Sequence, residues 1–354
     1  MTDTGSEYGL LSTKNGVELQ SFPVPAPAPN EVLIKNVAVA SNPKDWKYPI
    51  WVADYAAIEG NDVAGYIESV GEGVTGFKKG DGVAAFSKMA TKENKYGAYQ
   101  EYTVAPSGTT FPLGPNTSFE DASTLPLAVM TAVIGLFVNL GLPQPPESGF
   151  APARDDHAII INGAATSVGA FAVQLAKRAG LYVIGVASST SYARSMGADE
   201  LVNYREENDL ESALVNAAKS RKVSYAYDCV SENGSISLLS RVLSKTSANG
   251  KGKVTHILPL AEEEAKQIPN DIEPVGTWVR TAYGENSEFA AKYYRLLGRW
   301  LDEGSFKPNK VRVIPGGLAG VGGALKELQD GKVHGEKLVY RIAETPQIKE
   351  RDGK

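Results

Sequence analysis

Residues 157–187 carry the pattern that most limits how this chain can fold. The run HAIIING (157–163) is typical of a buried strand. In the following segment, residues 167–180, apolar side chains recur at three- to four-residue spacing, as in an amphipathic helix. A second strand, LYVIGVA, follows at 181–187. Strand, helix and strand in this order predict a parallel, doubly wound α/β sheet that binds its ligand at the carboxyl ends of the strands.

The loop between the first strand and its helix is a candidate pyrophosphate site. Its sequence, GAATSVG (163–169), stands where a dinucleotide-binding fold holds phosphates on helix N-terminal N–H groups. The match to G-x-G-x-x-G is incomplete, because Ala164 and Thr166 replace the first two glycines and only Gly169 remains. Such a loop also fits an ordinary strand-to-helix turn.

The end of the second strand favours NADP(H) over NAD(H) as the cofactor. The sequence ASSTSY (187–192) lacks the acidic residue that binds the adenine-side ribose in NAD enzymes. Hydroxyl groups here can donate to a 2′-phosphate, and Lys177 and Arg194 could add positive charge. The alternative is that these serines only cap the next helix.

The rest of the chain predicts a second, β-rich domain. Short strands at 31–40 and 62–71, a glycine turn at 80–82 and a further short strand indicate a small irregular β-barrel. After an amphipathic helix at 287–304, the tail contains strand and helix but no further nucleotide loop. We therefore expect a catalytic domain of residues 1–126 completed by 287–354, and a nucleotide-binding domain of residues 127–286.

Two further segments, 125–142 and 274–283, contain many apolar residues. Residues 125–142 are interrupted by Pro, Thr, Asn and Gly, so they predict a buried helix rather than a membrane span. PVGTWVRTAY (274–283) is expected to be the edge strand of the parallel sheet, with Trp278 and Arg280 within it. Those two side chains would not favour clean sheet pairing between subunits, so a monomer is weakly favoured over a homodimer.

Composition excludes several classes of function. The net charge of −5 is spread along the chain, which argues against nucleic acid or an anionic membrane as the partner. One cysteine, Cys229, and three isolated histidines provide no metal site. The N-terminus shows no secretory signal, so we expect a cytoplasmic protein.

Several motifs together resemble the medium-chain dehydrogenase/reductase superfamily. They are GNDVAG (60–65) with Val70, Gly71, Val74, Phe77, Gly80, Asp81 and Val83, then the SVG turn, GADELVNY and the C-terminal tail. The resemblance covers nearly the whole chain. It implies a GroES-like β-barrel catalytic domain with a Rossmann domain inserted into it.

The chain departs from the zinc-dependent members of that superfamily. They have histidine and glutamate where this chain has Asn61 and Asp62, and a cysteine near the position of residues 42–45. The four-cysteine structural zinc lobe is also missing. The resemblance therefore implies a zinc-free reductase, because alcohol oxidation would lack its Lewis acid.

Residues 42–47 and 125–132 are most similar to the trans-acting enoyl reductases of fungal polyketide synthases, the lovastatin type. By position, this resemblance implies that Lys47 and Thr131 line the nicotinamide and substrate pocket. It also implies cofactor contacts from a larger set of residues: Pro43, Lys44, Asp45, Trp46, Ala165, Thr166, Ser167, Val168, Ser188, Ser189, Tyr192, Tyr204, Leu258, Leu338 and Val339.

The expected reaction is hydride transfer from NADPH to the β-carbon of an α,β-unsaturated acyl thioester. Lys47 and Thr131 could donate hydrogen bonds to the enolate oxygen. Lys47 could instead be a solvated lysine at a strand end, and the Thr131 hydroxyl could bond its own helix. Asp45 and Asp62 are expected to have structural roles. Two other functions stay open: a quinone or enone reductase acting on a free small substrate, and a nucleotide-binding protein without turnover.

Overall fold

The computed structural model describes residues 5–353, apart from the side chains of residues 154–156. The chain forms two compact units. One comprises Met1–Leu127 with Arg280–Lys354, and the other comprises Ala128–Val279.

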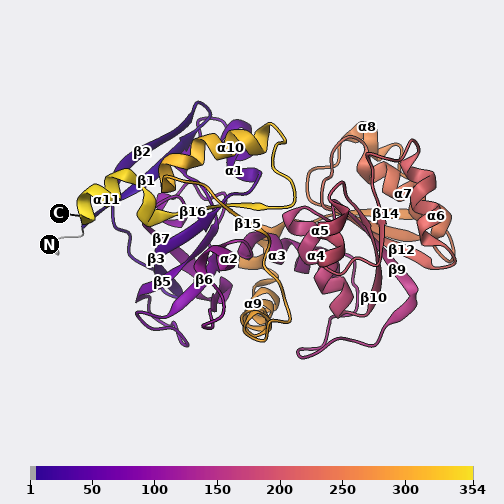
Figure 1. The fold of residues 1–354 in the computed structure, drawn as a ribbon, viewed down its shortest axis with the longest axis horizontal. Coiled ribbons are helices and arrows are strands. Elements are labelled where there is room, and N and C mark those ends of the chain that lie inside the picture. Colours follow the sequence, from indigo (N-terminus) through magenta and orange to yellow (C-terminus); the bar gives the residue numbers. More distant parts are fainter. Residues whose placement is uncertain (1–4, 354) are drawn as a thin grey trace. The chain divides into compact units, whose positions relative to one another are not determined.

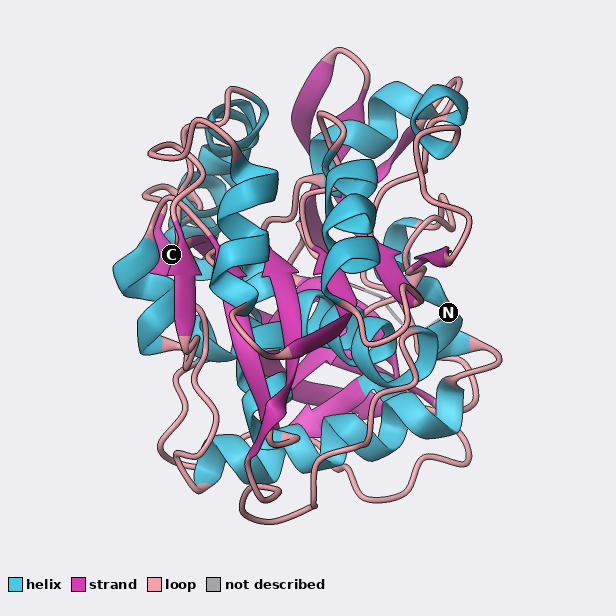
Figure 2. Ribbon diagram, turned by 90° about the vertical axis from the view of Figure 1, so that its right-hand side faces the viewer, coloured by secondary structure: helices cyan, strands magenta, loops and turns pink. Residues whose placement is uncertain are grey.

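The unit of residues 128–279 is built on a six-stranded parallel sheet. Its strand order is β11-β10-β9-β12-β13-β14, which in chain order is the 3-2-1-4-5-6 arrangement of a dinucleotide-binding fold. Helices α4 and α5 lie on one face and α6 and α7 on the other (Figure 1), and Figure 2 shows the strands flanked by helices. The predicted doubly wound sheet is confirmed. Its elements are β9 (Arg154–Asn162), α4 (Ser167–Arg178), β10 (Leu181–Val186), α5 (Thr190–Ser195), β11 (Glu200–Val202), α6 (Leu210–Ala218), β12 (Lys222–Asp228), α7 (Ser235–Thr246), β13 (Gly252–His256), α8 (Glu262–Ala265) and β14 (Ile272–Gly276).

Local sequence explains the central strand and its helix. Ile159, Ile160 and Ile161 of β9 are fully buried, as expected for a strand covered on both faces. Helix α4 begins after Thr166, whose hydroxyl accepts the N–H of Gly169 at 3.1 Å, and basic residues occupy its last turn.

The other unit contains two sheets. The larger has seven strands, in the order β15-β16-β3-β5-β6-β8, with β7 pairing along β3; the smaller has the order β2-β1-β4. Its core is formed by apolar side chains from β3, β5, β6, β16 and α10. The predicted strands at 31–40 and 62–71 are observed, and the tail strand β16 pairs with β3. The elements are β1 (Ser6–Thr13), β2 (Gly16–Pro23), β3 (Glu31–Ala40), α1 (Lys44–Trp51), β4 (Ala56–Ile58), β5 (Asp62–Val70), β6 (Gly82–Phe86), β7 (Tyr102–Pro106), β8 (Thr110–Pro112), α2 (Phe119–Ser123), α9 (Ser287–Asp302), β15 (Val311–Val313), α10 (Val321–Gln329), β16 (Lys337–Arg341) and α11 (Pro346–Asp352).

The apolar segment 125–142 forms a buried helix in two parts. Helix α3 (Pro126–Val133) continues as a π-helical segment, η3 (Ile134–Asn139). Gly135 is required at this point, because a Cβ there would lie 2.4 Å from the ring of Tyr227. Among the described residues, none of the helices combines the length and apolarity that a membrane crossing requires.

The prediction of a strand over 274–283 is wrong in its second half. Strand β14 ends at Gly276, opposite His256, where β13, its neighbour among the described strands, also ends. The chain beyond therefore has no strand to pair with and forms a short 3-10 helix, Val279–Tyr283. Trp278 and Arg280 lie outside the edge strand, and about half of the Trp278 surface is exposed.

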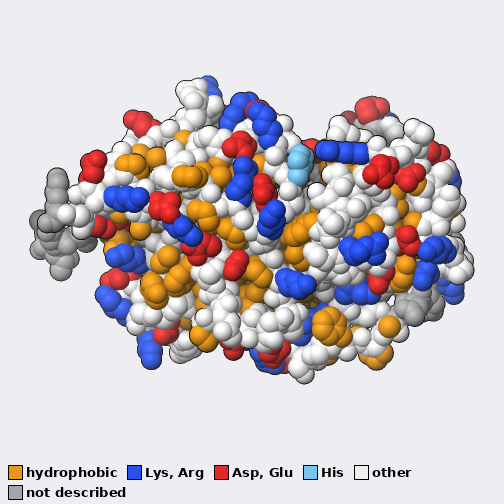
Figure 3. All heavy atoms as spheres, in the orientation of Figure 1, with side chains coloured by type: hydrophobic (Ala, Val, Ile, Leu, Met, Phe, Trp, Pro, Cys, Tyr) orange, Lys and Arg blue, Asp and Glu red, His pale blue; other side chains and the backbone are white. Residues whose placement is uncertain are grey.

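Charged side chains of both signs are interspersed on one face of the protein. On the face shown in Figure 3, Lys and Arg side chains alternate with Asp and Glu side chains. On that face, the mixed pattern agrees with the modest net charge of −5.

Candidate functional site

The loop after β9 has the backbone geometry that a nucleotide pyrophosphate requires. Gly163 has φ +74°, a conformation that favours glycine. A Cβ on Gly169 would lie 2.0 Å from the Gly163 carbonyl oxygen, so only glycine allows the helix to approach the strand this closely. The N–H groups of Ser167 and Val168, in the first turn of α4, have no acceptor within the helix. They can therefore receive an anion.

A polar cluster lies just beyond the end of β10. Hydrogen bonds from Ser188, and secondarily from Arg205, lower the pKa of the Tyr204 phenol below its ordinary value. Ser189 is the N-cap residue of α5, yet its side chain makes no capping hydrogen bond. The capping alternative therefore does not account for its hydroxyl. Hydroxyls and a guanidinium at this strand end can donate hydrogen bonds to an anionic group.

One residue beside this cluster adds a positive charge that the sequence did not single out, and one of the two expected charges is already paired. The Lys177 ammonium is bound by both carboxylate oxygens of Asp199, each at 2.8 Å, so it is not the expected free charge. Arg194 lies on the exposed side of α5. Arg205 was not singled out from the sequence, although it directly follows Tyr204 and stands after β11, the strand next to β10.

A second loop is held rigidly at the end of β12. The Asp228 carboxylate accepts from Asn162 Nδ2 at 2.9 Å, from the Ser231 N–H at 2.9 Å and from Ser235 Oγ at 2.5 Å. Ser231 Oγ in turn accepts the N–H of Ile257, just before Leu258. The ends of β9, β12 and β13 are thus joined by side chains, a feature the sequence reading missed.

The catalytic candidate Thr131 is buried in α3. Its carbonyl oxygen accepts a 2.6 Å hydrogen bond from the hydroxyl of Tyr227, which is fully buried. The close approach of the two segments depends on Gly135, one turn further along. Other expected contacts, Tyr192 in α5 and Leu258 beyond β13, are partly exposed.

Residues 43–47 form the beginning of helix α1, and their side chains make different contacts. Lys47 lies in helix α1, so the alternative of a strand-end lysine is wrong; Pro43 begins this helix at its N-cap. The Lys47 ammonium lies 5.5 Å from the Trp46 ring centroid and 5.9 Å from that of Trp51, within cation–π range. The buried indole N–H of Trp46 has no hydrogen-bond acceptor among the described residues.

Lys44 and Asp45 are engaged within their own unit. Asp45 Oδ2 accepts the N–H of Asn42 at 2.8 Å and the hydroxyl of Tyr99 at 2.6 Å. Burial and the Asp45 charge raise the pKa of Tyr99 well above its ordinary value. Asp45 therefore has the structural role expected for it, and any cofactor contact from this segment would come mainly from its backbone and from Trp46.

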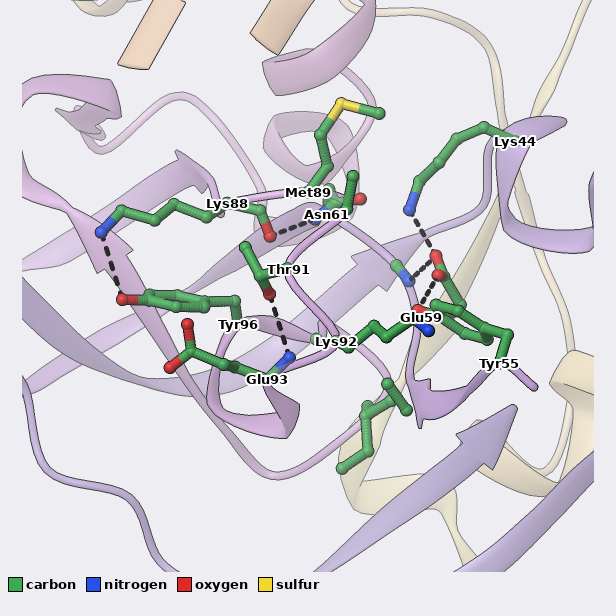
Figure 4. Close-up of a pocket in the computed structure, with 15 residues that line it drawn as sticks. Lys44, Tyr55, Glu59, Asn61, Lys88, Met89, Thr91, Lys92, Glu93 and Tyr96 are labelled. Carbon is green, nitrogen blue, oxygen red and sulfur yellow. Dashed lines mark hydrogen bonds and ion pairs between the residues drawn. The ribbon is translucent and has the colours of Figure 1, made fainter. Parts of the chain in front are cut away.

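A small polar pocket, lined by residues from 55–61 and 88–97 together with Lys44, lies beside this segment. In Figure 4, Lys44 points to Glu59, which also accepts from the hydroxyl of Tyr55. Burial lowers the pKa of Lys44, but the charges of Glu59 and Asp45 outweigh it and raise the pKa above its ordinary value. Asn61 donates to the carbonyl of Lys88 at 3.0 Å, while its own buried Oδ1 has no partner among the described residues.

Leu338 and Val339 are core residues of β16. Both side chains are buried, and the carbonyl of Leu338 accepts the N–H of Ser41 at 3.0 Å. No group of three or more His, Cys, Asp or Glu side chains that could hold a metal ion occurs in the described part of the chain.

Comparison with known proteins assigns the chain to a family. Residues 28–115 match the alcohol dehydrogenase GroES-like domain, and residues 167–268 match the zinc-binding dehydrogenase domain. A trans-enoyl reductase of Gibberella fujikuroi is 34% identical, with 88% of this chain and 91% of that protein covered. The chain belongs to the trans-enoyl reductase family. A second trans-enoyl reductase, from Alternaria alternata, is 31% identical over 94% of this chain and 98% of its own length.

The fold of this chain is similar to those of solved structures. The quinone oxidoreductase of Coxiella burnetii superposes with a TM-score of 0.72 at 23% identity, covering 96% of this chain and all of that one. The trans-enoyl reductase fold is thus that of the medium-chain dehydrogenases/reductases, with a GroES-like and a Rossmann domain, and its members are oxidoreductases that use a nicotinamide cofactor.

Proposed function

We propose that this chain is a zinc-independent, NADPH-dependent enoyl reductase that reduces an α,β-unsaturated acyl thioester in trans on a polyketide intermediate. In this assignment, residues 1–126 with 287–354 form the catalytic domain and residues 127–286 form the cofactor domain. The observation that carries the proposal is the cluster of Ser188, Tyr204 and Arg205 at the end of β10. It joins the family's reductase fold to a site suited to a 2′-phosphate.

The cofactor domain holds the dinucleotide through groups already oriented for it. Ser167 and Val168 present N–H groups at the start of α4, and Ala165 and Thr166 shape the loop that leads to them. Ser188, Tyr204 and Arg205 would donate to the 2′-phosphate, while an acidic side chain, which would repel it, is absent from residues 187–192. Bound NADPH supplies the hydride.

The catalytic residues act on the charge that develops on the thioester oxygen. Lys47 carries an ammonium and Thr131 a hydroxyl, and either can donate to an enolate oxygen. Asp45 is unsuited to proton transfer in this reaction, because its carboxylate already accepts two internal hydrogen bonds. Protonation of the α-carbon is left to Lys47, a tyrosine or water.

Zinc independence rests on the donor set rather than on an empty site. Asn61 uses its amide to hold the carbonyl of Lys88, and a carboxamide is a poor zinc ligand compared with histidine or cysteine. Asn42 and Asp62 stand in the segments that carry ligands in a zinc enzyme, and they are engaged with each other and with the ammonium of Lys337.

The test is NADPH oxidation with 2-enoyl thioesters of N-acetylcysteamine, simple enones and quinones, with NADH and with a chelator in parallel. We expect turnover of thioesters with NADPH that the chelator does not change. Turnover confined to quinones or enones would replace the proposal by a quinone reductase. No turnover, with NADPH still raising the melting temperature, would favour a binding-only role.

The cofactor preference has its own variant. Arg205→Ala should weaken NADPH binding about tenfold and leave NADH binding unchanged, because only NADPH carries the 2′-phosphate. Lys222→Ala, at the exposed beginning of β12, is the matched control and should change the affinity for neither cofactor. Equal weakening of both cofactors by Arg205→Ala would contradict the assignment.

A further inference from the structure

A closed triangle of buried polar groups lies at the centre of the catalytic unit. The ammonium of Lys337 lies 2.6 Å from Asn42 Oδ1 and 3.0 Å from Asp62 Oδ2, and Asn42 Nδ2 donates to the same Asp62 oxygen at 2.7 Å. The exposed fractions of the Lys337 and Asp62 side chains are 3% and 0%. A cation and an anion buried this deeply cost solvation free energy that only precise mutual placement can offset.

Two members of the triangle, Asn42 and Lys337, stand at the beginning of segments of the proposed site. Asn42 directly precedes Pro43 and the helix that carries Lys47, and its N–H is fixed by Asp45. Lys337 is the first residue of β16 and directly precedes Leu338 and Val339.

The third corner reaches the helix that carries Thr131. Asp62 is the first residue of β5, and its Oδ1 accepts the N–H of Leu127 at 2.6 Å. Leu127 lies in the first turn of α3, and Thr131 follows one turn later in that helix. The Asp62 carboxylate therefore holds the beginning of the Thr131 helix as well as the ammonium of Lys337.

We propose that Lys337 is a positioning residue for the reduction: its ammonium, held by Asn42 and Asp62, fixes the three segments that begin at residues 42, 126 and 337. This inference rests on the proposed function. Two of the corners, Asn42 and Asp62, stand in the segments where the zinc-dependent relatives have ligands. An internal ammonium ion thus supplies, in this chain, the positive charge around which those segments are organised.

The experiment separates positioning from simple stability with a double substitution in the full-length protein. Lys337→Met alone leaves the Asp62 carboxylate buried and unpaired, and should lower the melting temperature by roughly 10 °C. Adding Asp62→Asn removes that charge, and should return the melting temperature to within about 3 °C of the wild type, since a buried ion pair can be replaced at little cost.

Activity should not return with stability. In Lys337→Met/Asp62→Asn we expect kcat for a 2-enoyl N-acetylcysteamine thioester to stay about 30-fold below wild type, because misplaced catalytic segments cost rate rather than folding. We expect the NADPH dissociation constant, measured by tryptophan fluorescence, to rise about fivefold. If the double variant has a melting temperature, a kcat and an NADPH affinity equal to those of the wild type, the proposal is overturned.

A matched control is the Glu101–Arg351 ion pair, with an Nη1–Oε2 distance of 2.9 Å, which ties α11 to the same unit away from the triangle. Glu101→Gln/Arg351→Met should leave kcat and NADPH affinity at wild-type values, and a comparable loss there would also count against a specific role for Lys337. If the wild-type chain reduces no enoyl thioester, the proposed function fails, and NADPH affinity alone decides the role of Lys337.

Discussion

The two units hold their functional residues in different ways. In the nucleotide-binding unit, the turn of the pyrophosphate loop into its helix is shaped by contacts between residues at most six positions apart, such as the Thr166 cap on Gly169 and the packing of Gly169 on Gly163. Backbone hydrogen bonds from Gly163 and Ala164 to the carbonyl of Val186 then join this loop to the neighbouring strand β10. In the catalytic unit, Lys337 is held by Asn42, 295 positions away in the chain. The first arrangement depends on local backbone shape, and the second depends on charges that only folding brings together.

The largest effect should come from a substitution in the pyrophosphate loop. Gly169→Ala places a Cβ 2.0 Å from a backbone oxygen that cannot move without displacing β9. We expect NADPH binding to be abolished and the free energy of unfolding, measured by urea titration, to fall by about 3 kcal/mol or more. Gly323→Ala, in exposed space on α10, is the control and should be neutral or slightly stabilising. Equal behaviour of the two variants would show that the loop is not the tight element described.

A buried glutamate, Glu7, should make the stability of the catalytic unit depend on pH. Burial, and secondarily the charge of Glu101, raise the pKa of Glu7 to about 8, although the N–H of Tyr102 donates to it at 2.7 Å. The folded state therefore binds a proton that the unfolded state has released above pH 4.5. The stabilisation by Glu7 is complete below about pH 4.5 and is lost as pH rises towards 8, by roughly 4 kcal/mol.

The measurement compares urea unfolding of the wild type and Glu7→Gln at pH 5 and pH 8. The free energy of unfolding of the variant, relative to that of the wild type, should be higher at pH 8 than at pH 5, because glutamine has no charge to bury. Hydrogen exchange should show the pH effect in β1 and β7 but not in β9 and β10. A difference between the two proteins that does not change with pH would refute the shifted pKa.

A smaller loss is expected when a second buried pair of the catalytic unit is broken. Glu59→Gln removes the carboxylate that binds Lys44, whose side chain is 17% exposed. We expect a loss of about 2 kcal/mol in the free energy of unfolding, moderated because Asp45 remains 3.1 Å from the ammonium. Glu68→Gln breaks the exposed Lys79 pair of the same unit and should change nothing measurable. A similar loss in both would remove the distinction between buried and exposed pairs.

The smallest effect should be a gain in the nucleotide-binding unit. Lys219 ends α6 with φ +55° and ψ −125°, a conformation that favours glycine. Lys219→Gly should raise the melting temperature by about 2 °C in a thermal scan, despite the loss of the exposed contact with Glu200. Lys219→Ala loses that contact without relieving the backbone, so it should not share the gain.

Much of the fold could be predicted from the sequence because its signals are local. The buried run at 157–163 and the periodicity of 167–180 indicated β9 and α4, and alternating apolar residues indicated β3 and β5. The prediction for 274–283 was wrong because its strand ends where β13 ends, and a partner's length is not visible in the segment itself.

The candidate site was accessible only in part. Ser188 and Tyr204 were named, but their hydrogen bond, and the place of Arg205 beside them, depend on two strands lying next to each other. Lys177 was a possible source of positive charge for the phosphate, but its ammonium is bound to Asp199, which lies 22 residues further along the chain.

The sequence alone determined the parallel sheet, the glycine loop and the missing zinc ligands, because glycine, hydrophobic periodicity and residue identity act at or near their own positions. Only the tertiary structure decided which charges face one another. The bonds of Lys337 to Asn42 and Asp62, and that of Asp62 to Leu127, join segments from across the chain. A buried charge is tolerated only where an oppositely charged or hydrogen-bonding group lies beside it, and the whole fold determines which groups lie there.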